Sequence, residues 1–282
     1  MALFNRVTIV GLGLIGGSLG MALRRKRLAH EVVGLSRKPS TIAQAKRRGA
    51  IDWGSTSARE AVHDADVVIL ATPVDTIVPQ ARRVARFMKP GSVLTDVGST
   101  KARIVNNLEH ALPKRIAFVG AHPLAGSEQR GIAAARAALF DDSVCIVTTT
   151  PRTDQRALQT VVRLWKRLTR RVVVLDPTTH DRLLAAVSHL PHLLAFCLVE
   201  ATNHGALPLA PRSFLDATRV AKSDPDLWDD IFLSNRTALL AAIERFERRW
   251  RSLRRQLAEG DRVALRRFLS RAQSTRNALR ER

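Results

Sequence analysis

The sequence predicts an α/β domain with a doubly wound, mostly parallel sheet, followed by an all-α domain. Two observations carry this prediction. Short apolar, β-branched runs alternate with helix-like segments up to residue 176, and no convincing strand pattern follows. The 282 residues are enough for two domains, which we place at residues 1–176 and 177–282.

The alternation begins with the β-branched run Val7–Val10. Because apolar strands that alternate with helices are typical of βαβ units, we expect a parallel sheet with helices on both faces. Further strands are expected at Glu31–Leu35, Val67–Ala71, Val93–Asp96, Ile116–Gly120, Val144–Thr148 and Val172–Leu175. Helices are expected at Thr41–Gly49, Ala58–His63, Asp75–Met88, Lys101–Ala111 and Thr153–Leu168.

The second half contains two long helix patterns. The run His180–His204 is apolar on most sides, which predicts a buried helix. From Leu239 onward, apolar residues recur at alternating spacings of four and three, which predicts a heptad-like seam. We expect these helices to form a homodimer, and packing within one subunit is the alternative. The seam residues are Leu239, Ile243, Phe246, Trp250, Leu253 and Leu257.

The charge balance is strongly basic, with 46 Lys and Arg against 25 Asp and Glu and a net charge of +21. Such a surplus attracts nucleic acid, anionic membranes or anionic small molecules. Aromatic residues are only 5% and do not alternate with the basic ones, so we expect solvated helix faces and no nucleic-acid partner. No uncharged apolar run reaches about 18 residues, so we expect no membrane partner. Two cysteines without metal or redox spacing suit the cytoplasm, and the absence of tyrosine excludes a Tyr acid.

A glycine motif follows the first strand and opens a helix. Gly11 permits a tight turn, Gly13 lets the backbone approach a pyrophosphate, and Gly16 allows close packing of helix on strand. Leu14 and Ile15 lie between them at the helix start, which faces the phosphates. The motif predicts a Rossmann-type dinucleotide site, and a glycine-rich turn without a ligand is the alternative.

The turn after the second strand carries the cofactor preference. An NAD-specific site usually has an acidic residue here for the ribose 2′-hydroxyl, and Gly34–Thr41 contains none. Ser36, Arg37 and Thr41 could instead hold a 2′-phosphate, with Arg37 forming a charge-assisted pair and Lys38 as a weaker candidate. The turn therefore favours NADP, with weaker use of NAD.

Two more strands end in polar residues, and ligands bind at the carboxyl ends of strands in open α/β sheets. Thr72 and Pro73 follow the Val67 strand and are expected beside the nicotinamide, with a plain turn as the alternative. Ser99 follows the Val93 strand and is expected to contact substrate or nicotinamide. Its alternative role is the N-cap of the next helix, and the two roles are compatible.

His122 follows the Ile116 strand and precedes Pro123, which disfavours helical backbone before it. We expect it on an irregular turn at the carboxyl edge of the sheet. A histidine there is placed for general acid–base chemistry. A lone histidine is more often structural, but the neighbouring nicotinamide site favours the catalytic role.

Polar residues also interrupt the helical half. His189 and His192 share one helix face, and no nearby carboxylate completes a metal site, so substrate contact is favoured and no metal is expected. Arg219 lies between apolar neighbours, which indicates a buried carboxylate clamp. Asp224-Pro225 predicts a helix start, and Trp228 is expected in the core.

Together these motifs resemble the prephenate/arogenate dehydrogenase family, over nearly the whole chain and in the family's order. The turn Gly34–Thr41 is similar to that of NADP-dependent, arogenate-using members. The motifs that carry the resemblance are Gly11–Gly20, Asp96–Lys101, His122–Glu128, Ser188–His192 and Thr218–Trp228.

The resemblance implies oxidative decarboxylation of a cyclohexadienol that carries a ring carboxylate, in tyrosine biosynthesis. It implies that His122 takes the C4 hydroxyl proton while the C4 hydride moves to the nicotinamide, and that loss of CO₂ aromatises the ring. By position it assigns Arg219 and His189 to the substrate, Ser99 to orientation and Glu128 to gating of entry or ordering of its loop, with His192 as a further substrate contact. Many relatives have a basic residue where this chain has Leu215. The resemblance therefore does not decide whether prephenate or arogenate is the preferred substrate.

Three alternatives remain. An amino-substituted prephenate is a second substrate within the family. A β-hydroxyacid dehydrogenase would need a catalytic lysine in the helical half, where Lys222 is the only lysine and its context does not fit. A nucleotide sensor with a basic nucleic-acid-binding surface is the non-enzyme alternative.

Overall fold

The computed structural model describes residues 2–127 and 129–279. Its first half is a parallel six-stranded sheet, which confirms the predicted parallel arrangement, and its strand order is β3-β2-β1-β4-β5-β6. Val7 of β1 pairs with Val32 of β2 on one side and with Val67 of β4 on the other. The strands are β1 Phe4–Val10, β2 Ala29–Leu35, β3 Trp53–Ser55, β4 Val67–Leu70, β5 Val93–Asp96 and β6 Ala117–Val119.

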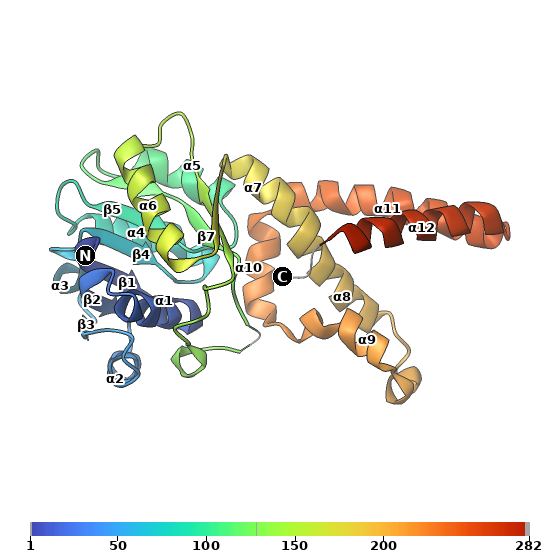
Figure 1. The fold of residues 1–282 in the computed structure, drawn as a ribbon, viewed down its shortest axis with the longest axis horizontal. Helices are drawn as coiled ribbons and strands as arrows, with labels where there is room; N and C mark the ends of the chain where they lie inside the picture. The colour runs from blue at the N-terminus through green and yellow to red at the C-terminus, as the bar shows by residue number, and fades with distance from the viewer. Residues whose placement is uncertain (1, 128, 280–282) are drawn as a thin grey trace.

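Helices cover both faces of this sheet, and each face has its own apolar core (Figure 1). Leu19 of α1 and Trp165 of α6 belong to one core. Ile77 of α4 and Ile104 of α5 belong to the other. The helices are α1 Leu14–Arg25, α2 Pro39–Arg47, α3 Ala58–Val62, α4 Val74–Ala85, α5 Ala102–Ala111 and α6 Gln155–Leu168, with the short η1 Ile132–Ala134.

A second, three-stranded sheet continues from the first through Gly120. Its strands are β7 Ala121–Pro123, β8 Val144–Thr148 and β9 Arg171–Leu175. β7 runs antiparallel to β8, and β9 runs parallel to β8. The sequence missed β7 and β3, because strands of three residues are too short to show a periodic pattern.

The second half is helical and extends away from the sheets (Figure 1). Asp176 and Asp224 cap α7 and α10, each followed by proline, as the Asp-Pro pattern predicted for α10. Trp228 and Ile231 of α10 join the core beside α4, so Trp228 is buried as expected. The elements are α7 Pro177–Leu184, the π-helical η2 Ala185–His189, α8 Leu190–Glu200, η3 His204–Leu209, α9 Arg212–Ala217, η4 Arg219–Lys222, α10 Pro225–Ser234, α11 Arg236–Ala258 and α12 Arg262–Ala278.

The expectation that the His180–His204 run is buried is wrong for a single chain. The helix that contains most of this run, Pro177–Glu200, is long and apolar enough to cross a membrane by length and composition, but only 22% of its most apolar window is buried. One such helix is weak evidence for a membrane span. Val187 is 73% exposed, and on α11 the seam residue Trp250 is 57% exposed. An apolar surface is therefore left for another molecule to cover.

Candidate functional site

The glycine turn between β1 and α1 has the geometry that a dinucleotide requires. Gly11 has φ +93°, and a Cβ there would lie 2.5 Å from the Ala71 carbonyl oxygen. A Cβ on Gly16 would lie 1.9 Å from the Gly11 carbonyl oxygen, so helix and strand pack closely. Gly13 has nothing within 4 Å of its missing Cβ and is the N-cap of α1 without a side-chain cap. Open space beside an uncapped helix start fits a pyrophosphate.

A second observation at this turn points to a bound polar group. The Thr72 hydroxyl is buried and has no hydrogen-bond partner among the described residues. Its methyl group lies against Gly11, where a Cβ would meet it at 2.9 Å. Pro73, the N-cap residue of α4, is exposed. A buried hydroxyl without a partner is costly, and a ligand beside Gly11 would satisfy it.

The predicted 2′-phosphate residues lie together at the end of β2. Arg37 is exposed, and Ser36 and Thr41 are half-buried at the start of α2. The Ser36 hydroxyl accepts a hydrogen bond from the Lys38 backbone N–H at 3.4 Å. Leu14 and Ile15 are half-buried on the first turn of α1 and pack against the core.

A buried ion pair fixes the end of β5. Lys101 and Asp96 are both fully buried, and Lys101 Nζ binds Asp96 Oδ2. Asp96 also accepts from the Gly98 N–H at 2.9 Å and from the Ala121 N–H at 3.3 Å. Since Ala121 begins β7, this carboxylate ties β5 to the strand that carries His122. Lys101 lies in the Asp96–Lys101 motif, and its structural role could not be predicted from the sequence.

His122 is buried within β7, not on an irregular turn as predicted. Pro123 ends the short strand, where its missing N–H is tolerated at a sheet edge. His122 Nδ1 lies 2.9 Å from Nε2 of His180 on α7. Burial lowers the pKa of His122 well below 6.5, and the neighbouring His180, Lys101 and His189 lower it further.

A chain of contacts continues from His180 to the start of α5. His180 Nδ1 lies 2.8 Å from Asp181 Oδ1. The Asp181 carboxylate accepts from the backbone N–H groups of Lys101 at 2.7 Å and Ala102 at 2.9 Å. Asp181 therefore caps α5, and Ser99, half-buried nearby, is not the N-cap that we considered.

His189 is held by the same helix junction. Asn235 donates from Nδ2 to the Asp181 carbonyl at 2.8 Å, and the same nitrogen lies 3.1 Å from His189 Nδ1. His189 is 1% exposed, and burial lowers its pKa to about 4. It ends the π-helical segment η2, a type of distortion that is frequent at functional sites.

His192 and Arg219 depart from the predicted arrangement. His192 stacks on the Trp228 ring with centroids 3.6 Å apart, and its Nδ1 lies 2.8 Å from the Ser188 carbonyl oxygen. Arg219 is exposed, so the buried clamp is wrong for a single chain, although the arginine is close enough to lower the pKa of His192. Within the described residues, no group of histidine, cysteine and carboxylate side chains could hold a metal ion. Glu128 lies outside the described residues.

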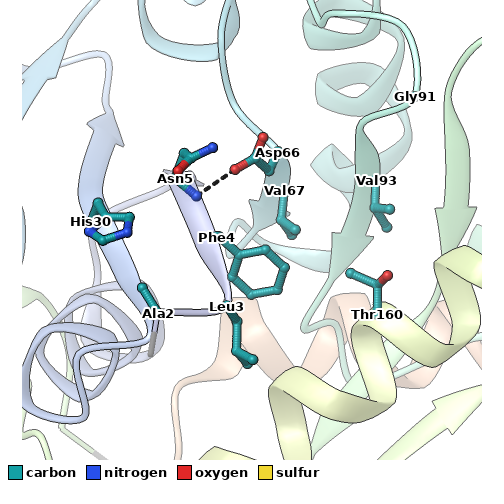
Figure 2. Close-up of a pocket in the computed structure, with 10 residues that line it drawn as sticks. All are labelled: Ala2, Leu3, Phe4, Asn5, His30, Asp66, Val67, Gly91, Val93 and Thr160. Carbon is teal, nitrogen blue, oxygen red and sulfur yellow. Dashed lines mark hydrogen bonds between the residues drawn. The ribbon is translucent and has the colours of Figure 1, made fainter.

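One cavity, of about 380 Å³, lies away from this site (Figure 2). Leu3, Phe4, Asp66 and Val93 line it, at the amino ends of β1, β4 and β5. Ligands of parallel sheets bind at the opposite, carboxyl ends. His122, Ser99 and the glycine turn all lie at those carboxyl ends, so we place the functional site there.

The glycine turn and the buried histidine at the carboxyl edge of the sheet are what an NAD(P)-dependent oxidoreductase requires. Comparison with known proteins identifies the family. The nucleotide-binding domain of prephenate dehydrogenase matches residues 19–174, and the prephenate dehydrogenase dimerization domain matches residues 176–271. The chain belongs to the prephenate dehydrogenase family.

Individual relatives agree with this family. The chain is 33% identical to cyclohexadienyl dehydrogenase of Zymomonas mobilis over 99% of this chain and 98% of that protein. Prephenate dehydrogenase from A. aeolicus, solved with hydroxyphenyl propionate and NAD⁺, is 35% identical with TM-score 0.90, covering 96% and 97% of the two chains. Synechocystis arogenate dehydrogenase is 28% identical with TM-score 0.84, covering 96% and 99%.

Three residues that organise the site were not predicted from the sequence: His180, Asp181 and Asn235. Their contacts join positions that are 46 to 80 residues apart in the chain. The one local signal was the polar pair His180-Asp181 at the start of an otherwise apolar helix.

Proposed function

We propose that the chain is an NADP-preferring arogenate/prephenate dehydrogenase that uses His122 as its base. The observation that carries this proposal is His122 itself, buried, held neutral and anchored at the carboxyl edge of a dinucleotide-binding sheet. In this proposal residues 1–176 bind the dinucleotide, and residues 177–282 supply substrate contacts and a dimer interface.

The chemistry follows from the neutral histidine. Because its pKa lies below 6.5, His122 is unprotonated at pH 7 and accepts the C4 hydroxyl proton of the substrate. When bound, the nicotinamide accepts the hydride from C4. As the ring carboxylate leaves as CO₂, the electron pair of its bond moves through the ring to the C4 oxygen. The ring is then an aromatic phenolate, which takes back the proton held by His122. His189 and Arg219 bind substrate carboxylates, and Ser99 orients the reactants.

Two further residues have weaker roles in this proposal. His192 contacts the substrate through the edge that its stacking on Trp228 leaves free. Glu128 orders the loop that follows β7. Leu215, where many relatives have a basic residue, is 57% exposed and supplies no charge to the substrate. The preference between prephenate and arogenate is therefore measured by comparing turnover of the two substrates.

The preference for NADP is supported by the turn after β2. Arg37 is exposed beside Ser36 and Thr41, and no carboxylate lies in the segment 36–41 to bind a 2′-hydroxyl. The A. aeolicus relative was solved with NAD⁺. Turnover with NADP⁺ is therefore compared directly with turnover with NAD⁺.

We also propose a cytoplasmic homodimer formed through the C-terminal helices. Val187 and Leu198 on η2 and α8, and Trp250 and Leu257 on α11, are between 46% and 73% exposed. Burying the exposed part of such side chains against a second copy is worth about 25 cal/mol for each Å² of apolar area covered. The strong positive charge then accelerates encounter with an anionic substrate and a phosphorylated cofactor.

The test is a four-way assay of nicotinamide reduction, with prephenate or arogenate offered with NADP⁺ or NAD⁺. Turnover with NADP⁺ exceeding that with NAD⁺ is the expected result, and the ratio between substrates gives the preference. No turnover in all four combinations, with NADP⁺ still bound, would overturn the substrate assignment. An amino-substituted prephenate would be tried next.

A further inference from the structure

Asp181 is linked to both histidines of the site. Its carboxylate reaches His122 through His180, and its main-chain carbonyl reaches His189 through Asn235. The hydrogen bonds around it also fix which ring nitrogen of each histidine carries a hydrogen. This inference rests on the proposed function for the reaction, and on the hydrogen-bond geometry and burial of the histidines for the arrangement of protons.

The side-chain branch begins at α5. The Asp181 carboxylate accepts two backbone N–H groups at the start of that helix, one on each oxygen, so both oxygens act as acceptors. His180 Nδ1, 2.8 Å from Asp181 Oδ1, must therefore carry a hydrogen. Burial lowers the pKa of His180, so the ring is neutral and its Nε2 is bare.

The bare Nε2 of His180 determines the state of His122. It lies 2.9 Å from His122 Nδ1, and two bare nitrogens cannot share a hydrogen bond. His122 Nδ1 therefore carries the hydrogen and donates it to His180. In a neutral ring this leaves His122 Nε2 bare, which is the state a proton acceptor needs.

The main-chain branch gives His189 the opposite arrangement. The Asp181 carbonyl only accepts, so the Asn235 side-chain nitrogen donates to it at 2.8 Å. The second hydrogen of that nitrogen points to His189 Nδ1 at 3.1 Å, which must be bare. A neutral His189 then carries its hydrogen on Nε2 and can donate to a substrate carboxylate oxygen.

We propose that Asp181 is a positioning residue that fixes His122 with a bare Nε2 as proton acceptor and His189 with Nε2–H as donor. All three groups are at least nine-tenths buried, so water does not compete for these contacts. The same residue also joins the α/β half to the helical half, because it caps α5 from α7.

The test is the nitrogen spectrum of the full-length protein labelled with ¹⁵N-histidine, recorded at pH 7 without substrate. His122→Asn and His189→Asn assign the two rings by loss of their signals. We expect protonated Nδ1 and bare Nε2 for His122, and the reverse for His189. A hydrogen on Nε2 of His122, or on Nδ1 of His189, would overturn the proposal. Because no substrate is present, a wrong substrate assignment leaves this result unchanged.

Kinetics of Asp181→Asn give the second readout. An amide can donate to His180 Nδ1, which reverses the chain and puts the hydrogen on His122 Nε2. We expect kcat to fall about 100-fold or more, with a smaller change in KM, as for loss of a general base. Asp176→Asn is the matched control. It removes one negative charge from the N-cap of α7, the helix that also carries Asp181, and it leaves the side-chain contacts of His180 unchanged.

If Asp181→Asn does not fold, substitutions at His180 replace it. His180→Leu removes the acceptor for His122 Nδ1 and should lower kcat to a similar extent. His180→Gln offers a side-chain oxygen near the position of Nε2 and should restore part of the loss. Unchanged kcat in Asp181→Asn or His180→Leu, with the His122 hydrogen still on Nδ1, would contradict the positioning role.

Discussion

Acidification is expected to destabilise the fold through His189. Burial lowers its pKa to about 4 from the ordinary 6.5, so the unfolded chain binds a proton in a range where the folded chain does not. The stability that His189 contributes is therefore complete above about pH 6.5 and is lost as the pH falls towards 4. At about 1.36 kcal/mol per pH unit, the loss between pH 6.5 and pH 5 is about 2 kcal/mol.

The assay is urea unfolding of the native chain and of His189→Asn at pH 7 and pH 5. Protein concentration is held fixed, because dimerisation would shift the apparent stability. Asparagine can still accept from Asn235 but does not titrate. Other buried histidines, such as His122 and His180, titrate in both proteins, so their effect cancels in the difference.

We expect the native chain to lose about 2 kcal/mol more than His189→Asn between the two pH values. Carboxylates whose pKa is lowered, such as Asp66, lose their contribution below pH 5 and do not interfere. An equal loss in both proteins would refute the buried, neutral state assigned to His189.

Three further predictions concern the cofactor turn and the dimer. Arg37→Ala should weaken NADP⁺ binding by about 1.5–3 kcal/mol in a fluorescence titration and leave NAD⁺ almost unchanged, and equal losses would exclude a 2′-phosphate contact. Gly16→Ala puts a Cβ against the Gly11 carbonyl oxygen and should cost about 3 kcal/mol or more in thermal unfolding, whereas Gly126→Ala, with open space, should cost little. Val187→Asp should shift the protein from dimer to monomer in sedimentation, and a variant that remains dimeric would place the interface elsewhere.

The predictable parts of the fold were those with strong local patterns. Continuous apolar strands such as Val67–Leu70 and the glycine turn at Gly11 follow from a few neighbouring residues, and both are present. The antiparallel β7 was not predictable in this way. Its three residues pair with β8 across a long connection, and its first N–H binds Asp96 on another strand.

The site shows the same division. His122 could be singled out because it follows a strand at the ligand-binding edge. Its partner His180 is 58 residues away, and the cap that Asp181 provides to α5 joins positions 79 and 80 residues apart. The burial of Arg219 was predicted from its neighbours in sequence, but in a single chain Thr218 is buried and Val220 half-buried while the Arg219 side chain itself is exposed.

The central claim is that His122 is the base of a dehydrogenase, and His122→Asn tests it most directly. Asparagine can still donate to His180 but lacks the nitrogen that accepts the substrate proton. We expect NADP⁺-dependent turnover to fall about 100-fold or more while the Kd for NADP⁺ stays within twofold. The control His110→Asn alters an exposed histidine on α5 and should keep full turnover. Turnover of His122→Asn within threefold of the native rate would contradict the account.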